Sequence, residues 1–585
     1  MRDVRAETMY FVFVDRFEDA DPANIVGKNA TCGDPHRKDP FKFWGGDLQG
    51  LLDRLDYLSG LGITSLRLSP IFEQMPGLGL TRGRPSAPYH GYWVADFRRI
   101  DPHLLPQLEW DRPFADRTTA FDRLLSACHQ RGIRVVLDVA CDRSNPGGEG
   151  APRGELRDDG HWLLSWEHDQ LGWYRKSVRE ADEGEDGPRF DETSASFRSY
   201  LRRVLLDWVD RGVDGYCFDA VHRMSIWFWQ ELTSTLRTEC PGISLAGVAR
   251  ARSSGDEAAV DFANQAGVRL LDFAFHRRIV EGLCWRDVGG FRRIALHLER
   301  DDMFEDATSL VTFLDTHKTP RLLSSGLPRE HLRLAIALLL TSRGIPCLFY
   351  GTEQGLHDDT EGGADPYNRP MMQSFDLDTP ESRTVSVLAA LRRENLAVQR
   401  GMYKTLWLSD DVLVFGRTYG QDSVVVALNR GPSTRIDVPE VPLPDGPVLD
   451  VLEGTGAFVR NGRLDRLELP AGAATVFAQT APREVVGASV LCRLSGYSTR
   501  FGESIVVTGS APELGEWDIA KAAPLHYVNR NLWLGDVVFD VSCGSRVLYK
   551  YAVVDGRGRV VRESCMPRHA LVPMTTGVEW ADRWG

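Results

Sequence analysis

The chain is rich in aromatic side chains, which can recognise a ligand by stacking. Its 585 residues include 15 Trp and 15 Tyr, and the flat face of such a ring suits a sugar ring. The alternative interpretation is that most of these rings fill the hydrophobic core. The ten cysteines form no CxxC pair and no zinc-type spacing. Cys217 and Cys347 lie in apolar, strand-like runs, which predicts buried free thiols and favours a reducing compartment.

Short apolar runs alternate with amphipathic stretches over the first 400 positions, a pattern typical of βα units. The expected strands are Met9–Val14, Ser65–Leu68, Arg134–Val139, Gly215–Asp219, Ser244–Val248, Leu270–Phe275, Leu310–Asp315 and Pro346–Tyr350. Helical patterns between them include Leu48–Leu61, Phe121–Arg131, Ser196–Arg211 and Glu330–Ser342. Eight such units predict an α/β fold, a (β/α)8 TIM barrel at 1–400, with its chemistry at the carboxyl ends of the strands. A stretch at about 140–190 is too long for a plain loop, which predicts a small inserted subdomain.

The pattern changes after about position 400. Alternating strands such as Val412–Arg417 and Ser423–Asn429, with prolines between strands, predict a small β-sandwich domain at 401–480. A second all-β domain is expected at 485–585. Its expected strands are Ser489–Leu494, Ser504–Thr508, Leu532–Phe539 and Arg546–Val554.

Charge and hydropathy exclude several classes of partner. The net charge of −13 argues against nucleic acid or an anionic membrane surface. No apolar run reaches the ~18–20 residues that a membrane span needs. The first residues, MRDVRAETMYFVFVDRF, lack the basic, apolar and small-residue order of a secretory leader. The chain as given is therefore predicted to be cytoplasmic, and secreted if a leader has been removed.

Several stretches, taken in chain order, resemble the α-amylase family (glycoside hydrolase family 13), and within it the cyclodextrin glucanotransferases and maltogenic amylases. They are DRFEDADPAN (15–24), WGGDLQG (44–50), YHGYWVADF (89–97), VVLDV (135–139), GVDGYCFDAVHR (212–223), TFLDTHKTPR (312–321), SRGIPCLFYGTEQG (342–355) and GGADPYNRPMM (362–372). Near the C-terminus, VTGSAPELGEWD (507–518) and LYKYAVV (548–554) resemble a family 20 starch-binding module. The resemblance implies an α-glucan ligand such as starch, glycogen or a maltooligosaccharide.

The chemistry of that family needs three carboxyl groups, which act as nucleophile, general acid and transition-state stabiliser. Asp219 occupies the nucleophile position, but the arginine two residues earlier, which normally keeps the nucleophile ionised, is Cys217. The acid position is Val248 and the stabiliser position is Lys318. A cation opposes the positive charge that develops in the transition state. We therefore predict a degenerate site, in which Asp219 either survives as a nucleophile or only neutralises Lys318.

The resemblance also implies two calcium sites. Beside the active site, Asp142 is followed by Arg143, and two further positions of the site are Arg189 and Arg223. Arginines repel a divalent cation, so this site is predicted lost, with Asp142 paired to Arg189 or Arg223. The loop near the N-terminus keeps oxygen donors, which predicts Ca²⁺ there, and the alternative is an acidic surface loop. The donor positions are Asp19, Asp21, Asn24, the Gly45 carbonyl and Asp47.

Sugar-binding positions are better kept than catalytic ones. Their family roles are an aromatic platform (Tyr92 and Trp93), its hydroxyl partners (His90 and His317) and a donor-side subsite (Asp365 and Arg369). The alternative is that these residues now only pack the barrel mouth. In the C-terminal module, Trp517 and Lys550 match one starch-binding surface, whose second tryptophan is here Arg562, so weakened glucan binding is expected.

Three hypotheses follow. The preferred one is an α-glucan-binding pseudoenzyme that acts alone or as an accessory subunit of an active relative or another protein. The second is an active hydrolase or glucanotransferase that uses Asp219 with a relocated acid, for which Asp256, Glu257, His222 and Asp315 are candidates. The third is a protein-interaction scaffold.

Overall fold

The computed structural model describes residues 3–26, 31–110, 112, 115–145, 164, 169, 171–175, 188–249, 257–285, 289–482, 488–539, 544–572 and 578–585, with the side chains of 257 and 258 left out. Apolar side chains form the strands at its centre; Val135, Val136 and Leu137, for example, are completely buried. Eight parallel strands follow the order β10-β9-β8-β7-β2-β1-β12-β11, and a parallel bridge between Leu271 and Val311 closes the ring. The strands are β1 (Met9–Val12), β2 (Ser65–Leu68), β7 (Arg134–Val139), β8 (Gly215–Phe218), β9 (Ser244–Gly247), β10 (Arg269–Leu270), β11 (Val311–Phe313) and β12 (Ile345–Phe349).

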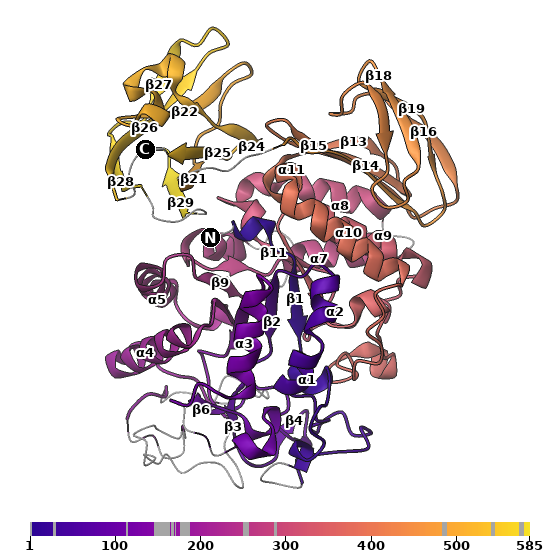
Figure 1. Cartoon of the computed structure of the whole chain (residues 1–585), viewed down its shortest axis with the longest axis vertical. Coiled ribbons are helices and arrows are strands. Elements are labelled where there is room, and N and C mark those ends of the chain that lie inside the picture. Colours follow the sequence, from indigo (N-terminus) through magenta and orange to yellow (C-terminus); the bar gives the residue numbers. More distant parts are fainter. Residues whose placement is uncertain are drawn as a thin grey trace.

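Amphipathic helices surround this ring (Figure 1). Helix α4 (Ala195–Arg211) illustrates why they form: the Ser194 side chain caps its first turn, and Gly212 ends it in a left-handed conformation. Its buried residues recur at helical spacing and face the barrel. The other helices are α1 (Leu48–Asp53), α2 (Leu55–Gly60), α3 (Ala120–Gln130), α5 (Ile226–Glu239), α6 (Glu257–Gln265), α7 (Phe273–Ile279), α8 (Gly290–Leu298), α9 (Leu332–Thr341), α10 (Pro380–Glu394) and α11 (Leu396–Arg400).

The predicted (β/α)8 barrel is thus confirmed, with two local differences. The strand expected at Leu270–Phe275 is shorter, because Asp272 accepts the N–H of Phe275 at 2.8 Å and starts α7 at Phe273. The helix expected at Leu48–Leu61 divides at Arg54, whose backbone is not helical. The subdomain expected at about 140–190 lies largely outside the described residues.

Two short strand pairs shape the mouth of the barrel. Strand β3 (Phe72–Gln74) pairs with β6 (Val94–Ile100), and β4 (Gly79–Thr81) pairs with β5 (Arg84–Ser86). Gln74 fixes the segment before β6, because its Oε1 accepts the N–H of Trp93 at 2.8 Å and its amide donates to the Gly91 carbonyl at 2.9 Å. The aromatic pair Tyr92–Trp93 is therefore held at the carboxyl end of the barrel.

Two antiparallel sheets follow the barrel, in the orders β13-β14-β15-β20 and β16-β19-β18-β17, and enclose a core of aliphatic side chains. Their strands are β13 (Met402–Leu408), β14 (Val412–Tyr419), β15 (Asp422–Asn429), β16 (Thr434–Val438), β17 (Gly446–Leu449), β18 (Gly456–Arg460), β19 (Arg463–Leu469) and β20 (Ala474–Gln479). These positions fall within the range predicted for the first all-β domain, 401–480.

The C-terminal residues form two further sheets that pack face to face. Their strands are β21 (Ala488–Ser495), β22 (Ser504–Gly509), β23 (Ala523–Pro524), β24 (His526–Asn529), β25 (Leu532–Phe539), β26 (Arg546–Val554), β27 (Val560–Glu563), β28 (Arg568–Leu571) and β29 (Val578–Arg583). We call this segment, 488–585, the C-terminal module. Trp533 belongs to its core and is 4% exposed.

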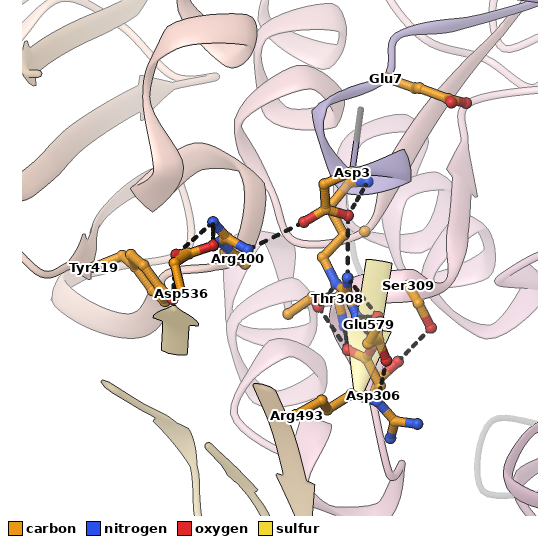
Figure 2. A network of polar contacts seen from close by, with 12 residues as sticks. Asp3, Glu7, Asp306, Thr308, Ser309, Arg400, Tyr419, Arg493, Asp536 and Glu579 are labelled. Carbon is orange, nitrogen blue, oxygen red and sulfur yellow. Dashed lines mark hydrogen bonds and ion pairs between the residues drawn. The ribbon is translucent and has the colours of Figure 1, made fainter. Parts of the chain in front are cut away.

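The C-terminal module lies at the end of the barrel opposite β3, β4 and β6, near the N-terminus (Figure 1). An ion pair joins the two: Arg5 donates to Glu579 of β29 at 3.0 Å, and on either side Asp306 of the barrel and Arg493 of the module extend this cluster, each at 2.5 Å. Arg400 joins Asp536 of β25 at 2.8 Å (Figure 2). Among the described residues, no helix has the length and apolarity to cross a membrane.

Candidate functional site

A cavity of about 840 Å³ opens at the carboxyl ends of the barrel strands. All the residues predicted to catalyse reactions or to bind sugar in the barrel line it. They are His90, Tyr92, Trp93, Asp219, Val248, His317, Lys318, Asp365 and Arg369. The sequence prediction and the cavity therefore involve the same residues.

Asp219 follows β8 directly and is 1% exposed. Both of its carboxylate oxygens are engaged by cations. Oδ1 forms an ion pair with Lys318 Nζ, and Oδ2 accepts from Arg143 Nη2 at 2.6 Å. The predicted Asp219–Lys318 pair is confirmed, and Arg143 is a second partner.

These two cations control the ionisation of the carboxyl group. Burial by itself raises the pKa of Asp219, but Lys318 and Arg143 outweigh burial and hold that pKa well below its usual range. The carboxylate is therefore ionised at neutral pH. Its charge is balanced by two cationic partners.

The general-acid position carries no proton donor. Val248 follows β9 and is 2% exposed; its N–H donates to the Phe218 carbonyl at 2.8 Å, and its own carbonyl accepts from Val221 at 3.0 Å. Its backbone is thus fully used, and its aliphatic side chain lines the cavity. Asp365 is the other carboxylate among the described lining residues, and it pairs with Arg369 at 2.9 Å.

The relocated-acid candidates lie in different environments. Asp315 has a structural role, because its two oxygens accept from Leu322 N–H at 3.0 Å and from the Thr352 hydroxyl at 2.7 Å. His222 lines the cavity, and burial together with Arg223 lowers its pKa. Asp256 and the Glu257 side chain lie outside the described residues.

Arginines occupy the positions of the family's calcium site beside the cavity. Arg143 donates to both oxygens of Asp142, at 2.9 and 3.1 Å, and Arg223 donates to the same carboxylate at 3.3 Å. The predicted Asp142–Arg223 pair is present, and Arg189 is joined to Arg143 by a backbone bridge. Arg143 was not foreseen in this role. It links Asp142 to Asp219, so a single guanidinium contacts both carboxylates.

Tyr92 is fixed in place by polar contacts. Its hydroxyl donates to Asp138 Oδ2 at 2.9 Å and lies 3.1 Å from His317 Nε2, and its ring stacks on His317 with the centroids 5.4 Å apart. Arg67 donates to both oxygens of Asp138, at 2.6 and 2.8 Å. The platform is therefore rigid. Arg67 and Asp138 were not identified as site residues from the sequence, because both lie within predicted strands whose side chains were expected to fill the core.

The other sugar-binding candidates surround this platform. His90 packs edge-on against Trp93, with the ring centroids 4.7 Å apart, and Arg369 donates to the His317 carbonyl at 3.0 Å. Burial is the largest of the effects that hold the pKa of both histidines well below the usual value, and Arg369 adds to it. Both imidazoles are therefore neutral at neutral pH. The ring nitrogens of His317 contact the Tyr92 and Thr316 hydroxyls, whereas His90 accepts the Tyr92 N–H on Nδ1 and can offer Nε2 to a sugar hydroxyl.

In the N-terminal loop, the five predicted donors lie together but differ in their contacts. Asp47 Oδ2 accepts from Asn24 Nδ2 at 2.9 Å and from the Asp21 N–H at 3.0 Å, and Asp19 Oδ2 pairs with Arg37 at 2.9 Å. Two buried oxygens, Asp19 Oδ1 and Asn24 Oδ1, have no hydrogen-bond partner among the described residues. Burial, reinforced by Asp19, raises the pKa of Asp47 to about 6.

This donor set is compatible with Ca²⁺. Asp19 Oδ1 and Asn24 Oδ1 are buried oxygens without a donor among the described residues, and burial disfavours the ionised form of Asp47. A hard cation bound here would accept electron density from these oxygens and stabilise the carboxylate. The Gly45 backbone lies close by, since a Cβ on it would be 2.9 Å from Asp19 Oδ2. Within the described residues, no three His, Cys, Asp or Glu side chains cluster closely enough to hold a metal by themselves. Ca²⁺ here would therefore need Asn24 and the Gly45 carbonyl.

In the C-terminal module, Trp517 and Lys550 lie side by side. Trp517 is 39% exposed, and Lys550 Nζ is 6.0 Å from its ring centroid while pairing with Glu563 at 2.5 Å. Arg562 instead lies over the ring of Tyr497, 5.8 Å from its centroid. One exposed indole thus offers a stacking surface.

Comparison with known families agrees with this geometry. Residues 11–145 match the model "Alpha amylase, catalytic domain", 403–478 match "Neopullulanase-like, C-terminal domain", and 488–581 match "Starch binding domain". The first match ends before Asp219, Val248 and Lys318.

Whole-chain relatives are cyclomaltodextrin glucanotransferases. The protein from Klebsiella oxytoca is 29% identical over 91% of this chain and 87% of its own length. That from Niallia circulans is 31% identical over 81% of this chain and 67% of its own length.

Solved structures extend the comparison. A cyclomaltodextrin glucanotransferase with a three-domain ABC distribution has a TM-score of 0.74 and 32% identity, covering 82% of this chain and 100% of its own. The γ-cyclodextrin enzyme (Gamma-CGTASE) from alkalophilic Bacillus clarkii has a TM-score of 0.73 and 25% identity, covering 100% and 99%. The chain belongs to the α-amylase family, glycoside hydrolase family 13, and carries a C-terminal starch-binding domain.

Proposed function

We propose that this protein binds α-1,4-glucans with little or no hydrolysis and acts as a pseudoenzyme or accessory subunit. The observation that carries the proposal is the state of Asp219, whose two oxygens are bound by Lys318 and Arg143. Two cations on one carboxylate stabilise its negative charge in the ground state and so lower its nucleophilicity toward an anomeric carbon.

The missing acid supports the same conclusion. A retaining glycosidase holds two carboxyl groups about 5–5.5 Å apart, and the second one protonates the leaving oxygen. Here the corresponding position is aliphatic, and Asp365 is engaged by Arg369. Loss of proton transfer alone lowers a rate by about 10²–10⁴. The cation at position 318 would further destabilise an oxocarbenium-like transition state.

Glucan binding is supported by features that do not depend on catalysis. The cavity combines a fixed aromatic platform, Tyr92 and Trp93, with His90, a neutral histidine that can offer Nε2 to a sugar hydroxyl. The starch-binding domain adds Trp517 beside Lys550. A glucan could therefore be held at two places without being cleaved.

The second candidate is an active hydrolase or glucanotransferase. It is favoured by the relatives, which are named as glucanotransferases. It requires a relocated acid, for which the candidates are His222, which lines the cavity, and Asp256 and Glu257, whose side chains lie outside the described residues. A test of binding and turnover in the same samples separates the two candidates.

We expect maltoheptaose and β-cyclodextrin to bind in titration calorimetry, with no product after long incubation. Tyr92→Ala should weaken binding at the barrel and Trp517→Ala should weaken binding at the module, each by about tenfold, because one stacking contact is worth about 1 kcal/mol or more. Tyr527→Ala, another aromatic truncation in the module, is a control. Product that disappears in Asp219→Asn would show that the nucleophile works and would overturn the proposal.

We further propose that the N-terminal loop binds Ca²⁺ through Asp19, Asp21, Asn24, Gly45 and Asp47, and that the site at Asp142, Arg189 and Arg223 no longer does. Calcium should raise the thermal unfolding midpoint and chelation should lower it. At a concentration 100 times Kd the gain is about 2.7 kcal/mol.

Asp47→Asn should abolish this calcium response. Asparagine keeps the oxygen that caps α1 but removes the charge. Asp56→Asn, at a carboxylate that is 89% exposed, is the matched control. A calcium response that is unchanged in Asp47→Asn would place the ion elsewhere.

A further inference from the structure

A second cavity, of about 440 Å³, lies at the opposite end of the barrel from the candidate glucan site. The amino ends of β7 and β10 and the segments before β9 and β11 form its barrel side, and β21 and β29 of the C-terminal module form the other side. Its volume is within the range of small-molecule sites, about 300–1,000 Å³. We call it the floor cavity.

The carboxylates that line the floor cavity are already bound by arginines. Asp3, Asp306 and Glu579 all contact Arg5, at 3.1, 2.5 and 3.0 Å (Figure 2). Glu305, the fourth, pairs with Arg583 at 3.3 Å. Each of these four groups already has an arginine partner within ion-pair distance.

Two of the five lining arginines have no carboxylate partner among the described residues. Arg5 and Arg493 share Glu579, and Arg134 pairs with Glu7 at 2.7 Å. Arg237, at the exposed rim, donates to the Gly267 carbonyl at 2.5 Å, and the buried Nη1 of Arg269 has no hydrogen-bond partner in the described part of the chain.

The Nη1 of Arg269 is therefore a buried donor that no described group satisfies. Burial lowers its pKa, Glu579 opposes that effect and Arg5 adds to it. The nearest further candidate, Glu7, has its own pKa raised to about 7 by burial. Burying a guanidinium N–H without an acceptor is unfavourable. A bound anion would supply that acceptor and a counter-charge.

We propose that the floor cavity binds the phosphate group of a small metabolite between Arg237 and Arg269. Phosphate is the oxyanion whose geometry guanidinium groups match with paired hydrogen bonds. A neutral sugar would leave both charges unsatisfied. The volume leaves room for an organic part, such as a sugar ring, beside the phosphate. This site lies outside the glucan cavity and does not depend on the function proposed above.

The test is titration calorimetry of the full chain with inorganic phosphate and with glucose 6-phosphate, at constant ionic strength, with glucose as the neutral control. We expect both phosphates to bind and glucose not to bind at this site. Arg237→Gln and Arg269→Gln should each weaken binding by about tenfold or more, because each removes a charged hydrogen bond. Arg383→Gln, which removes an exposed charge elsewhere, should change nothing.

The two probes also identify the source of the phosphate. Tighter binding of glucose 6-phosphate indicates that the organic part is contacted, and equal binding indicates that the phosphate group alone is recognised. The absence of binding by both phosphates would overturn the proposal, as would binding that persists unchanged in both arginine variants. Since Arg237 is exposed, its variant keeps the test decisive even if Arg269→Gln folds poorly.

Discussion

Asp219→Asn is expected to lower the free energy of unfolding by about 3–5 kcal/mol, because it removes one partner of a buried ion cluster. The substitution keeps the shape of the side chain but leaves Lys318 and Arg143 facing each other without their shared counter-charge. In an enzyme whose nucleophile is unpaired and strained, the same change costs little or stabilises the fold. Denaturant unfolding of the purified variant measures the difference.

The pH dependence of this cost follows from the lowered pKa of Asp219. A carboxyl group with a lowered pKa contributes stability that is fully present above its unfolded pKa, about 3.9, and is lost as the pH falls through the folded value. The gap between wild type and Asp219→Asn should therefore be constant from pH 5 to 8 and shrink only below about pH 4. Lys318→Met added to Asp219→Asn should recover part of the loss, and Asp378→Asn at an exposed carboxylate is the control. An equally stable Asp219→Asn protein would contradict the ion-cluster interpretation.

The double variant Val248→Glu, Lys318→Asp is expected to hydrolyse maltoheptaose. Its rate should exceed that of the wild type by about 10²–10⁴-fold. The first change supplies a proton donor at the end of β9. The second replaces the adverse cation with a carboxylate and releases Asp219 Oδ1. Product analysis by chromatography after timed incubation measures the gain.

Each single variant should gain much less than the pair, because proton donation and charge stabilisation act in the same transition state. Adding Asp219→Asn to the pair should abolish the new activity, which excludes a contaminating amylase. If the wild type already cleaves maltoheptaose as fast as the double variant, its catalytic groups lie elsewhere. The prediction that positions 248 and 318 have lost the acid and the stabiliser would then be wrong.

Much of the barrel could be predicted because its strands are continuous apolar runs. The ends of strands were harder to predict, since they depend on single side chains. Asp272 shows why: its capping bond to Phe275 turns a run that suits a strand into the start of a helix. The split at Arg54 likewise depends on one backbone conformation that periodicity does not encode.

The location of the candidate site was predictable from motifs, but its electrostatics were not. Motif register placed Asp219 and Lys318 on facing loops, and their pairing follows from charge alone. The motif comparison assigned Arg143 to a calcium site. Its hydrogen bond to Asp219 depends on the direction of the side chain across the barrel mouth, which the sequence does not give. Arg67 and Asp138 gave no signal, because a buried ion pair inside strand runs resembles core in the sequence.

The position of the C-terminal module has a consequence for the way in which the molecule can engage a polysaccharide. The module is held on the floor of the barrel by the pairs Arg5–Glu579 and Arg400–Asp536, and the sheet that contains β22 and β26 lies on its far side (Figure 1). The C-terminal module and the cavity at the carboxyl ends of the barrel strands therefore lie at opposite ends of the barrel. One glucan chain would have to run along the length of the barrel to reach both, so we expect a short oligosaccharide to gain no avidity from the two. A molecule occupied at both ends would instead connect two glucan strands, so that the protein would act as a cross-link within a granule.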